Sequence, residues 1–202
     1  MQFGVRDIEP EEWPLLEDFL YEAIYIPEDF VGEVPRTIIY VDPWCRAAFE
    51  GFGTRPDDRG VVATVGGRVV GACWARTTNE YGHIDDNTPS LSISLYKPYR
   101  GQCMGTAMMH ALLGELCDAG YARASLSVQK QNPALRLYER AGFRLVERRP
   151  GGPGGRERVE AGGLGAPLHS SLQNLSPFTA LRHRVPSAVL PPICLSKHSH
   201  FY

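Results

Sequence analysis

Apolar positions along the first 149 residues follow two periods, one typical of strands and one typical of helices. Residues 59–78 hold two runs rich in β-branched side chains, and Gly66-Gly67 joins them. A glycine pair between two such runs is typical of a tight hairpin. Residues 90–96, Ser-Leu-Ser-Ile-Ser-Leu-Tyr, then alternate polar and apolar positions. These patterns predict a β-hairpin followed by a third strand.

The clearest helical pattern lies in residues 104–121. Its apolar side chains recur every three or four positions, and the segment closes on Ala-Gly, which is typical of a helix end. Residues 124–129 return to strand alternation. Residues 132–142 predict a short helix with Asn132 as N-cap and Pro133 at the first position, and residues 143–149 predict one more strand.

The N-terminal third is less regular. Residues 2–9 predict an opening strand, and residues 10–25 predict a helix that starts at Pro10, where two glutamates favour the helix dipole. Residues 35–53 have helical spacing that Pro43 interrupts, so they predict one or two short helices. Strands and helices thus follow one another along the chain, which predicts an α/β fold.

Composition narrows the class of partner. The 202-residue chain has a net charge of −2, a pI near 6.3 and no sustained basic run, unlike a nucleic-acid-binding protein. No apolar run approaches the ~20 residues of a membrane span, and the N-terminus is acidic where a signal peptide is basic. We predict a cytoplasmic protein that binds neither nucleic acid nor membrane. The odd number of single cysteines favours reduced thiols: Cys45, Cys73, Cys103, Cys117 and Cys194.

The character of the chain changes near residue 150. Residues 1–149 carry 21 acidic and 16 basic side chains, whereas residues 150–202 carry two acidic and five basic ones and open with Pro-Gly-Gly-Pro-Gly-Gly. We predict one domain over 1–149 and a low-complexity, disordered tail over 150–202. A shifted reading frame near residue 150 is one hypothesis for the change, and it implies the loss of a closing strand. Cys194, His198 and His200 lack a second ligand pair, so we predict no metal site.

A glycine-bearing loop connects the third predicted strand to the long helix. Residues 100–106 aim several backbone N–H groups at one point, and the start of the helix adds partial positive charge, so the loop suits a pyrophosphate. An ordinary strand-to-helix turn is the alternative. Cys103 stands between Gly101 and Gly105, where a loop that contacts an anion through its backbone is expected to lack a side chain.

Two motifs give the chain a resemblance to the GCN5-related N-acetyltransferase family. The acetyl-CoA loop of that family has the pattern Arg/Gln-x-x-Gly-x-Gly/Ala, which Arg100 and Gly105 match while Cys103 replaces the first glycine. The second motif is an Asn that opens a helix, a Tyr six residues later and a following Gly-Phe. It is matched by Asn132, Pro133, Leu137, Tyr138, Gly142 and Phe143. The resemblance covers residues 1–149, and its specific motifs lie in the second half.

The resemblance implies a central mixed β-sheet flanked by helices, with strands that splay at an acetyl-CoA site. It also implies direct transfer of acetyl to an amine. Asn132 would contact the pantetheine arm, and Tyr138 would be the general acid that protonates the departing thiolate of CoA. The other implied cofactor-binding residues are the strand residues Ile93, Ser94 and Leu95 and the loop residues Arg100, Gly101, Gln102, Cys103, Met104, Gly105 and Thr106.

The general base is not marked by a motif. Some family members use a glutamate on the strand after the long helix, but the comparable position here is Ser127, which cannot serve. A polar cluster in residues 79–89 supplies the alternatives: Glu80, Tyr81, His83, Asp85 and Asp86. We predict His83 and Asp85 as catalytic residues, because histidine titrates near neutral pH and an aspartate attracts a cationic amine. A solvated loop without catalytic function is the alternative.

Two functions remain open from the sequence. The first is an N-acetyltransferase acting on a primary amine of a small molecule or peptide. The second is a catalytically impaired relative that binds or senses acyl-CoA, an alternative motivated by Cys103 and the unusual tail. The acceptor is not specified by any motif, and a homodimer is left open.

Overall fold

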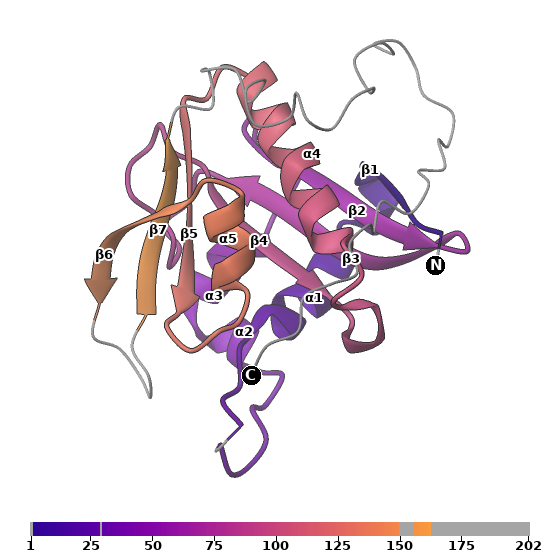
Figure 1. The fold of residues 1–202 in the computed structure, drawn as a ribbon, viewed down its shortest axis with the longest axis vertical. Helices are drawn as coiled ribbons and strands as arrows, with labels where there is room; N and C mark the ends of the chain where they lie inside the picture. The colour runs from indigo at the N-terminus through magenta and orange to yellow at the C-terminus, as the bar shows by residue number, and fades with distance from the viewer. Residues whose placement is uncertain (1, 29, 150–155, 163–202) are drawn as a thin grey trace, which may run out of the picture.

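The computed structural model describes residues 2–28, 30–149 and 156–162, and these ranges form one sheet with helices on both faces (Figure 1). The strands are β1 (Gly4–Asp7), β2 (Arg59–Val65), β3 (Arg68–Arg76), β4 (Ser90–Leu95), β5 (Arg123–Gln129), β6 (Arg144–Arg149) and β7 (Arg156–Gly162). The α-helices are α1 (Leu15–Ala23), α2 (Ile38–Val41), α3 (Pro43–Phe49), α4 (Met104–Asp118) and α5 (Leu135–Arg140). Two 3₁₀ turns, η1 (Pro10–Glu12) and η2 (Lys97–Tyr99), precede α1 and α4.

The sheet is mixed, as the resemblance implied. Within the described residues its seven strands have the order β1-β2-β3-β4-β5-β7-β6, and every neighbouring pair is antiparallel except β4 and β5. That parallel pair has a single register pair, Ser90 with Ser125, so the two strands diverge beyond it. The backbone groups on the β5 side of the rest of β4 therefore have no register partner on β5.

Each face of the sheet has its own core. Helices α4 and α5 cover one face, where Met108, Leu112 and Leu116 of α4 are buried and α4 packs mainly against β2 and β3. Helices α1, α2 and α3 cover the other face, around Leu16 and Phe19. The apolar stripe of α4 and the alternation of the central strands explain this arrangement, because each element must bury one apolar face.

The predicted hairpin is confirmed. Strands β2 and β3 are antiparallel, and the connecting Gly66 and Gly67 have φ of 57° and 79°. Positive φ at both central positions is the geometry that matches the twist of a two-residue hairpin, and glycine adopts it without strain. The predicted segment 35–53 forms two short helices, α2 and α3, with Pro43 starting the second.

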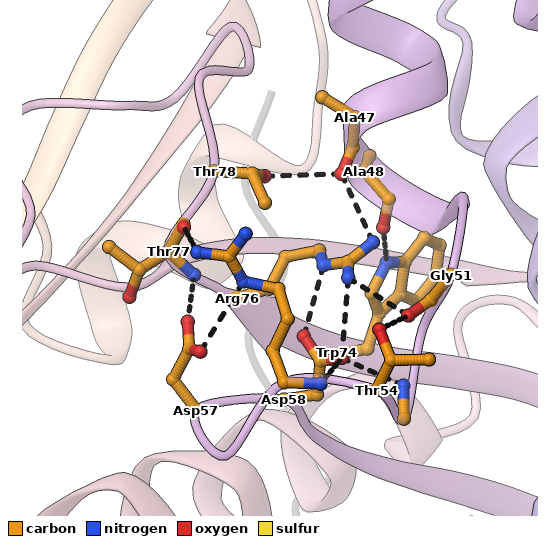
Figure 2. Close-up of polar contacts among 12 residues, drawn as sticks. Ala47, Ala48, Gly51, Thr54, Asp57, Asp58, Trp74, Arg76, Thr77 and Thr78 are labelled. Atoms are coloured by element: carbon orange, nitrogen blue, oxygen red, sulfur yellow. Dashed lines mark hydrogen bonds and ion pairs between the residues drawn. The ribbon is translucent and has the colours of Figure 1, made fainter.

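Arg76, at the end of β3, fixes the C-terminal end of α3 to the sheet (Figure 2). Its guanidinium donates to the carbonyl oxygens of Ala47 and Glu50 at 3.2 and 2.8 Å and to the carboxylate of Asp58 at 3.0 Å. The Arg76 and Asp58 side chains are each 2% exposed. Trp74 adds a bond from its indole N–H to the carbonyl of Ala48 at 2.8 Å. These contacts satisfy carbonyl groups at a helix end that have no intrahelical donor.

We expect Arg76→Met to lower the free energy of unfolding by about 3–5 kcal/mol, because it leaves the buried carboxylate of Asp58 without its partner. Urea denaturation would measure the change. The control is Arg46→Met, which breaks an exposed pair with Glu50 and is expected to cost about 0–1 kcal/mol. Equal losses for Arg46→Met and Arg76→Met would contradict this role for Arg76.

Two predicted boundaries require correction. The hypothesis of a shifted reading frame implies the loss of a closing strand, but β7 lies between β5 and β6 and pairs antiparallel with both. The domain therefore extends past the predicted limit of 149, at least to Gly162. Helix α5 begins at Leu135 rather than Pro133, and Asn132 accepts instead from the N–H of Ala134 at 2.9 Å, in the turn that precedes the helix. The predicted disorder of the tail from 163 onward and the histidines near its end lie outside the described residues.

Candidate active site

A cavity of about 120 Å³ lies where β4 and β5 diverge. Its walls come from the end of α1, from α3, from the loop between β3 and β4, from β4 and β5, and from the α5 region. The single register pair between the two strands leaves room for it, since strands that stayed paired would fill this space with their own side chains and backbone. The cavity therefore lies at the point of the sheet where strand backbone is available to a ligand.

Glu80 is the acidic side chain that the fold places on this cavity. It is 8% exposed and lies in the loop after β3. Burial raises the pKa of Glu80 to about 7, while the Ser90 hydroxyl and the charge of Arg76 act in the opposite direction. A carboxylate with a pKa near 7 is suited to accept a proton at neutral pH.

Tyr138 reaches the same cavity from α5. Its side chain is 7% exposed and packs edge-on against Phe143, with ring centroids 6.1 Å apart. Burial raises the pKa of the Tyr138 phenol above its usual value, and the nearby Cys73 adds to that effect. The phenol therefore stays protonated at neutral pH and is able to donate a proton or a hydrogen bond.

His83 and Asp85, the predicted catalytic pair, do not line this cavity. The carboxylate of Asp85 accepts from the N–H of Asn87 at 2.9 Å and from Arg123 at 2.7 Å. It also accepts from the Thr88 hydroxyl, and that bond lowers the pKa of Asp85. The ring of His83 lies 3.9 Å from the carboxylate of Asp86. Asp85 thus orders the loop, and of the predicted polar cluster the cavity wall holds Glu80 and Tyr81.

Of the predicted cofactor-binding residues on β4, one has its side chain on the cavity wall and two have theirs elsewhere. Ile93 lines the cavity. The hydroxyl of Ser94 donates to the carbonyl of Phe19 at 2.6 Å, and Leu95 is buried in the core beneath α4. Asn132 lies on the cavity wall near Tyr138. Any contact of Ser94 or Leu95 with a ligand in the cavity therefore has to come from the backbone.

The loop before α4 is a tight turn held by its own polar side chains. Arg100 donates to the carbonyl of Leu95 at 2.8 Å and pairs with Glu22 at 3.0 Å, and Gln102 donates to the carbonyl of Pro98 at 2.8 Å. The first N–H groups of α4, at Met104, Gly105 and Thr106, have no acceptor within the helix. This helix end offers donors and a favourable dipole to an anion.

Cys103 is the N-cap of α4 and has φ 66° and ψ −7°, in the left-handed region. It is the one non-glycine residue with positive φ in the described ranges, and its side chain is exposed. A Cβ in this region costs about 1–2 kcal/mol because it approaches the following carbonyl. The position thus has the backbone geometry that glycine adopts freely, as the sequence motif suggested.

Comparison with known proteins agrees with this architecture. The chain belongs to the acetyltransferase (GNAT) family, because the family model matches residues 19–143, more than half of its length. No curated protein sequence matches the chain. Among solved structures, a GCN5-related N-acetyltransferase from Kribbella flavida has 19% identity and a TM-score of 0.58, and the alignment covers 79% of this chain and 97% of that one.

Two further solved structures share the fold. The ribosomal-protein-S18-alanine N-acetyltransferase from Escherichia coli has 17% identity and a TM-score of 0.54, with 79% of this chain and 93% of that one covered. A putative acetyltransferase from Salmonella typhimurium, solved with its cofactor acetyl-CoA, has 15% identity and a TM-score of 0.55 over the same shares of the two chains. At these identities the likeness shows the fold alone.

Sequence reasoning did not single out Glu80 or the pocket role of Trp44 and Cys45. Glu80 was one of five polar residues in a loop, and no spacing signal marks which of them points inward.

No helix in the described part of the chain is long and apolar enough to cross a membrane. In the same residues, His, Cys, Asp and Glu side chains do not gather into a group of three or more suited to a metal ion.

Proposed function

We propose that this protein is an acetyl-CoA-dependent N-acetyltransferase that transfers acetyl directly to a primary amine, with Glu80 as general base and Tyr138 as general acid. The observation that carries the proposal is that these two side chains line one cavity at the divergence of β4 and β5. A buried carboxylate and a protonated phenol in one cavity are the acid and base that amide formation from a thioester requires.

The residues present fit an acyl-CoA cosubstrate. The unpaired part of β4 and Asn132 would hold the pantetheine arm along the cavity, and the N–H groups at the start of α4 would hold the pyrophosphate. Bound acetyl-CoA supplies an activated acetyl thioester. A solved relative in this fold contains acetyl-CoA, which supports the same cosubstrate here.

Each chemical role follows from the state of the side chain. Glu80, ionised above pH about 7, takes a proton from the ammonium of the acceptor so that the free amine can attack the thioester carbonyl. As the carbon–sulfur bond breaks, Tyr138 gives a proton to the departing sulfur. The second proton lost from the nitrogen restores the Tyr138 phenol, and Glu80 releases the proton it took to solvent. The products are the N-acetyl amine, CoA with a free thiol and one proton.

The proposal is tested with the full chain, acetyl-CoA and a panel of amines, amino acids and peptide N-termini. Mass spectrometry of the acetylated product is the preferred readout, because an exposed thiol at Cys103 interferes with colorimetric detection of CoA. Acetyl-CoA-dependent formation of an N-acetyl product is the expected result. Tight binding of acetyl-CoA without turnover of any amine would instead favour the alternative of an acyl-CoA-binding or sensor protein.

The backbone of Cys103 leads to a prediction about cofactor affinity. We expect Cys103→Gly to tighten acetyl-CoA binding by about ten- to a hundredfold, because it removes a side chain from the anion site. Calorimetry at fixed pH and salt would measure Kd. Cys103→Ala is the control, since it removes the thiol and keeps the strained Cβ. Equal or weaker binding by Cys103→Gly would show that the cysteine is accommodated or useful.

A further inference from the structure

An open apolar pocket adjoins the candidate active site on the side of α2 and α3. Its volume is about 370 Å³, and its lining residues are Ile38, Val41, Asp42, Pro43, Trp44 and Tyr81. Trp44 and Tyr81 also line the inner cavity, so the two spaces share one aromatic wall. We call this space the outer pocket. A ligand bound to Glu80 in the inner cavity would extend past these two rings into the outer pocket.

The aromatic wall is held in place from both sides. The rings of Trp44 and Tyr81 pack edge to face, with centroids 4.7 Å apart and planes at 87°. Asp42, the N-cap of α3, accepts from the backbone N–H of Trp44 at 2.8 Å and from the Tyr81 hydroxyl at 2.5 Å. One carboxylate therefore holds the backbone of Trp44 and the hydroxyl of Tyr81, and the contact between the two rings orders the wall before a ligand binds.

The lining of the outer pocket is mostly apolar. Both carboxylate oxygens of Asp42 already accept hydrogen bonds, from the backbone N–H groups of Trp44 and Cys45 and from the Tyr81 hydroxyl. The remaining lining side chains present hydrocarbon or aromatic surface, and Val41 is 71% exposed and Trp44 42% exposed. Exposed apolar side chains gathered in a pocket favour an apolar ligand, and a second ammonium group would meet one carboxylate whose two oxygens already accept hydrogen bonds.

We propose that the outer pocket is the acceptor subsite and that it selects primary amines carrying an apolar, ring-sized group. This inference rests on the proposed function and specifies its acceptor class. The ammonium lies at Glu80 in the inner cavity, and the apolar group lies against Trp44, Tyr81 and Val41. An amine with a short or doubly charged chain makes the contact with Glu80 and lacks the apolar contact in the outer pocket.

Binding and turnover test this separately. Calorimetric titration of protein saturated with CoA should show that 2-phenylethylamine binds at least about tenfold more tightly than ethylamine, and 1,5-diaminopentane should bind no better than ethylamine. The ratios of kcat/KM should follow the same order. If ethylamine or 1,5-diaminopentane binds as tightly as 2-phenylethylamine, or more tightly, the subsite is overturned. Binding in the expected order without any acetylated product supports the subsite and contradicts the proposed function instead.

A matched pair of variants locates the selectivity. Val41→Asp places a charge in the outer pocket at an exposed position, and we expect it to lower the preference for 2-phenylethylamine over ethylamine by about tenfold or more. Val146→Asp makes the same change on β6, where the side chain is 54% exposed and outside the pocket, and should leave the preference unchanged. An unaltered preference in Val41→Asp, or an equal loss in both variants, overturns the proposal.

Discussion

Glu80→Gln is expected to lower kcat/KM for the acceptor amine by about 10²–10⁴-fold, the contribution usual for a general base. The substitution keeps the size and the polar end of the side chain but removes its ability to take a proton. Glu80 is the acidic residue on the cavity wall among the described residues, so the loss has no obvious substitute within the site. Steady-state kinetics at saturating acetyl-CoA would measure it.

The pH dependence gives this prediction a second readout. Burial raises the pKa of Glu80 to about 7, and the base is active when ionised, so kcat/KM should fall about tenfold per pH unit below that value and level off above it. Because Glu80 takes its proton from the ammonium form of the acceptor, deprotonation of the acceptor amine adds a second, falling limb at higher pH. In Glu80→Gln the limb near pH 7 should disappear, which a purely structural role for Glu80 does not predict.

Glu115→Gln is the matched control. Burial also raises the pKa of this glutamate, to about 8, but Glu115 lies on α4 near Asp7 and does not line the cavity. Its substitution should leave kcat and the pH profile near pH 7 unchanged. Activity of Glu80→Gln within a few-fold of wild type would remove Glu80 from the mechanism.

Tyr138→Phe is expected to lower kcat by about 10²–10⁴-fold while Kd for acetyl-CoA stays within a few-fold of wild type. Phenylalanine keeps the packing against Phe143 and removes only the hydroxyl that would protonate the departing sulfur. A loss in kcat rather than in binding is the mark of a group that acts in the transition state. Calorimetry for Kd and single-turnover kinetics for the chemical step would separate the two effects.

Tyr121→Phe is the control for Tyr138. Tyr121 is partly buried against the same core and does not line the cavity, so its loss of a hydroxyl should leave kcat unchanged. Thermal unfolding of both variants would check that the fold is kept. An unchanged kcat in Tyr138→Phe would exclude the phenol as the general acid.

The position of Glu80, the proposed general base, shows where sequence reasoning stopped. Five polar residues between β3 and β4 were candidates, and side-chain chemistry favoured His83 and Asp85 over Glu80. In the fold, Asp85 is occupied by Thr88 and Arg123, while Glu80 is buried on the cavity wall. The pKa of Glu80 is raised by burial, and the cavity that Glu80 lines is also formed by α1, α3 and β5, which lie far from it in the sequence.

Strand β7 shows a different limit. Its segment, Arg156–Gly162, has several charged residues and follows a glycine- and proline-rich stretch, so its local pattern does not favour a strand. In the structure it pairs with β5 over residues 123–129 and also with β6. Strand formation there depends on two neighbours that already present unpaired edges, and local propensity does not record such partners.

The sequence by itself determined the elements that carry their own periodic signal and the family that two motifs define. Alternation and helical spacing placed the β2–β3 hairpin, β4, β5 and α4, because each period reports which side chains one element buries. The loop motif also located Cys103, whose φ of 66° fits a glycine position. Only the tertiary structure decided which polar side chains meet, because the cavity exists where β4 and β5 separate and its walls come from segments distant in the chain.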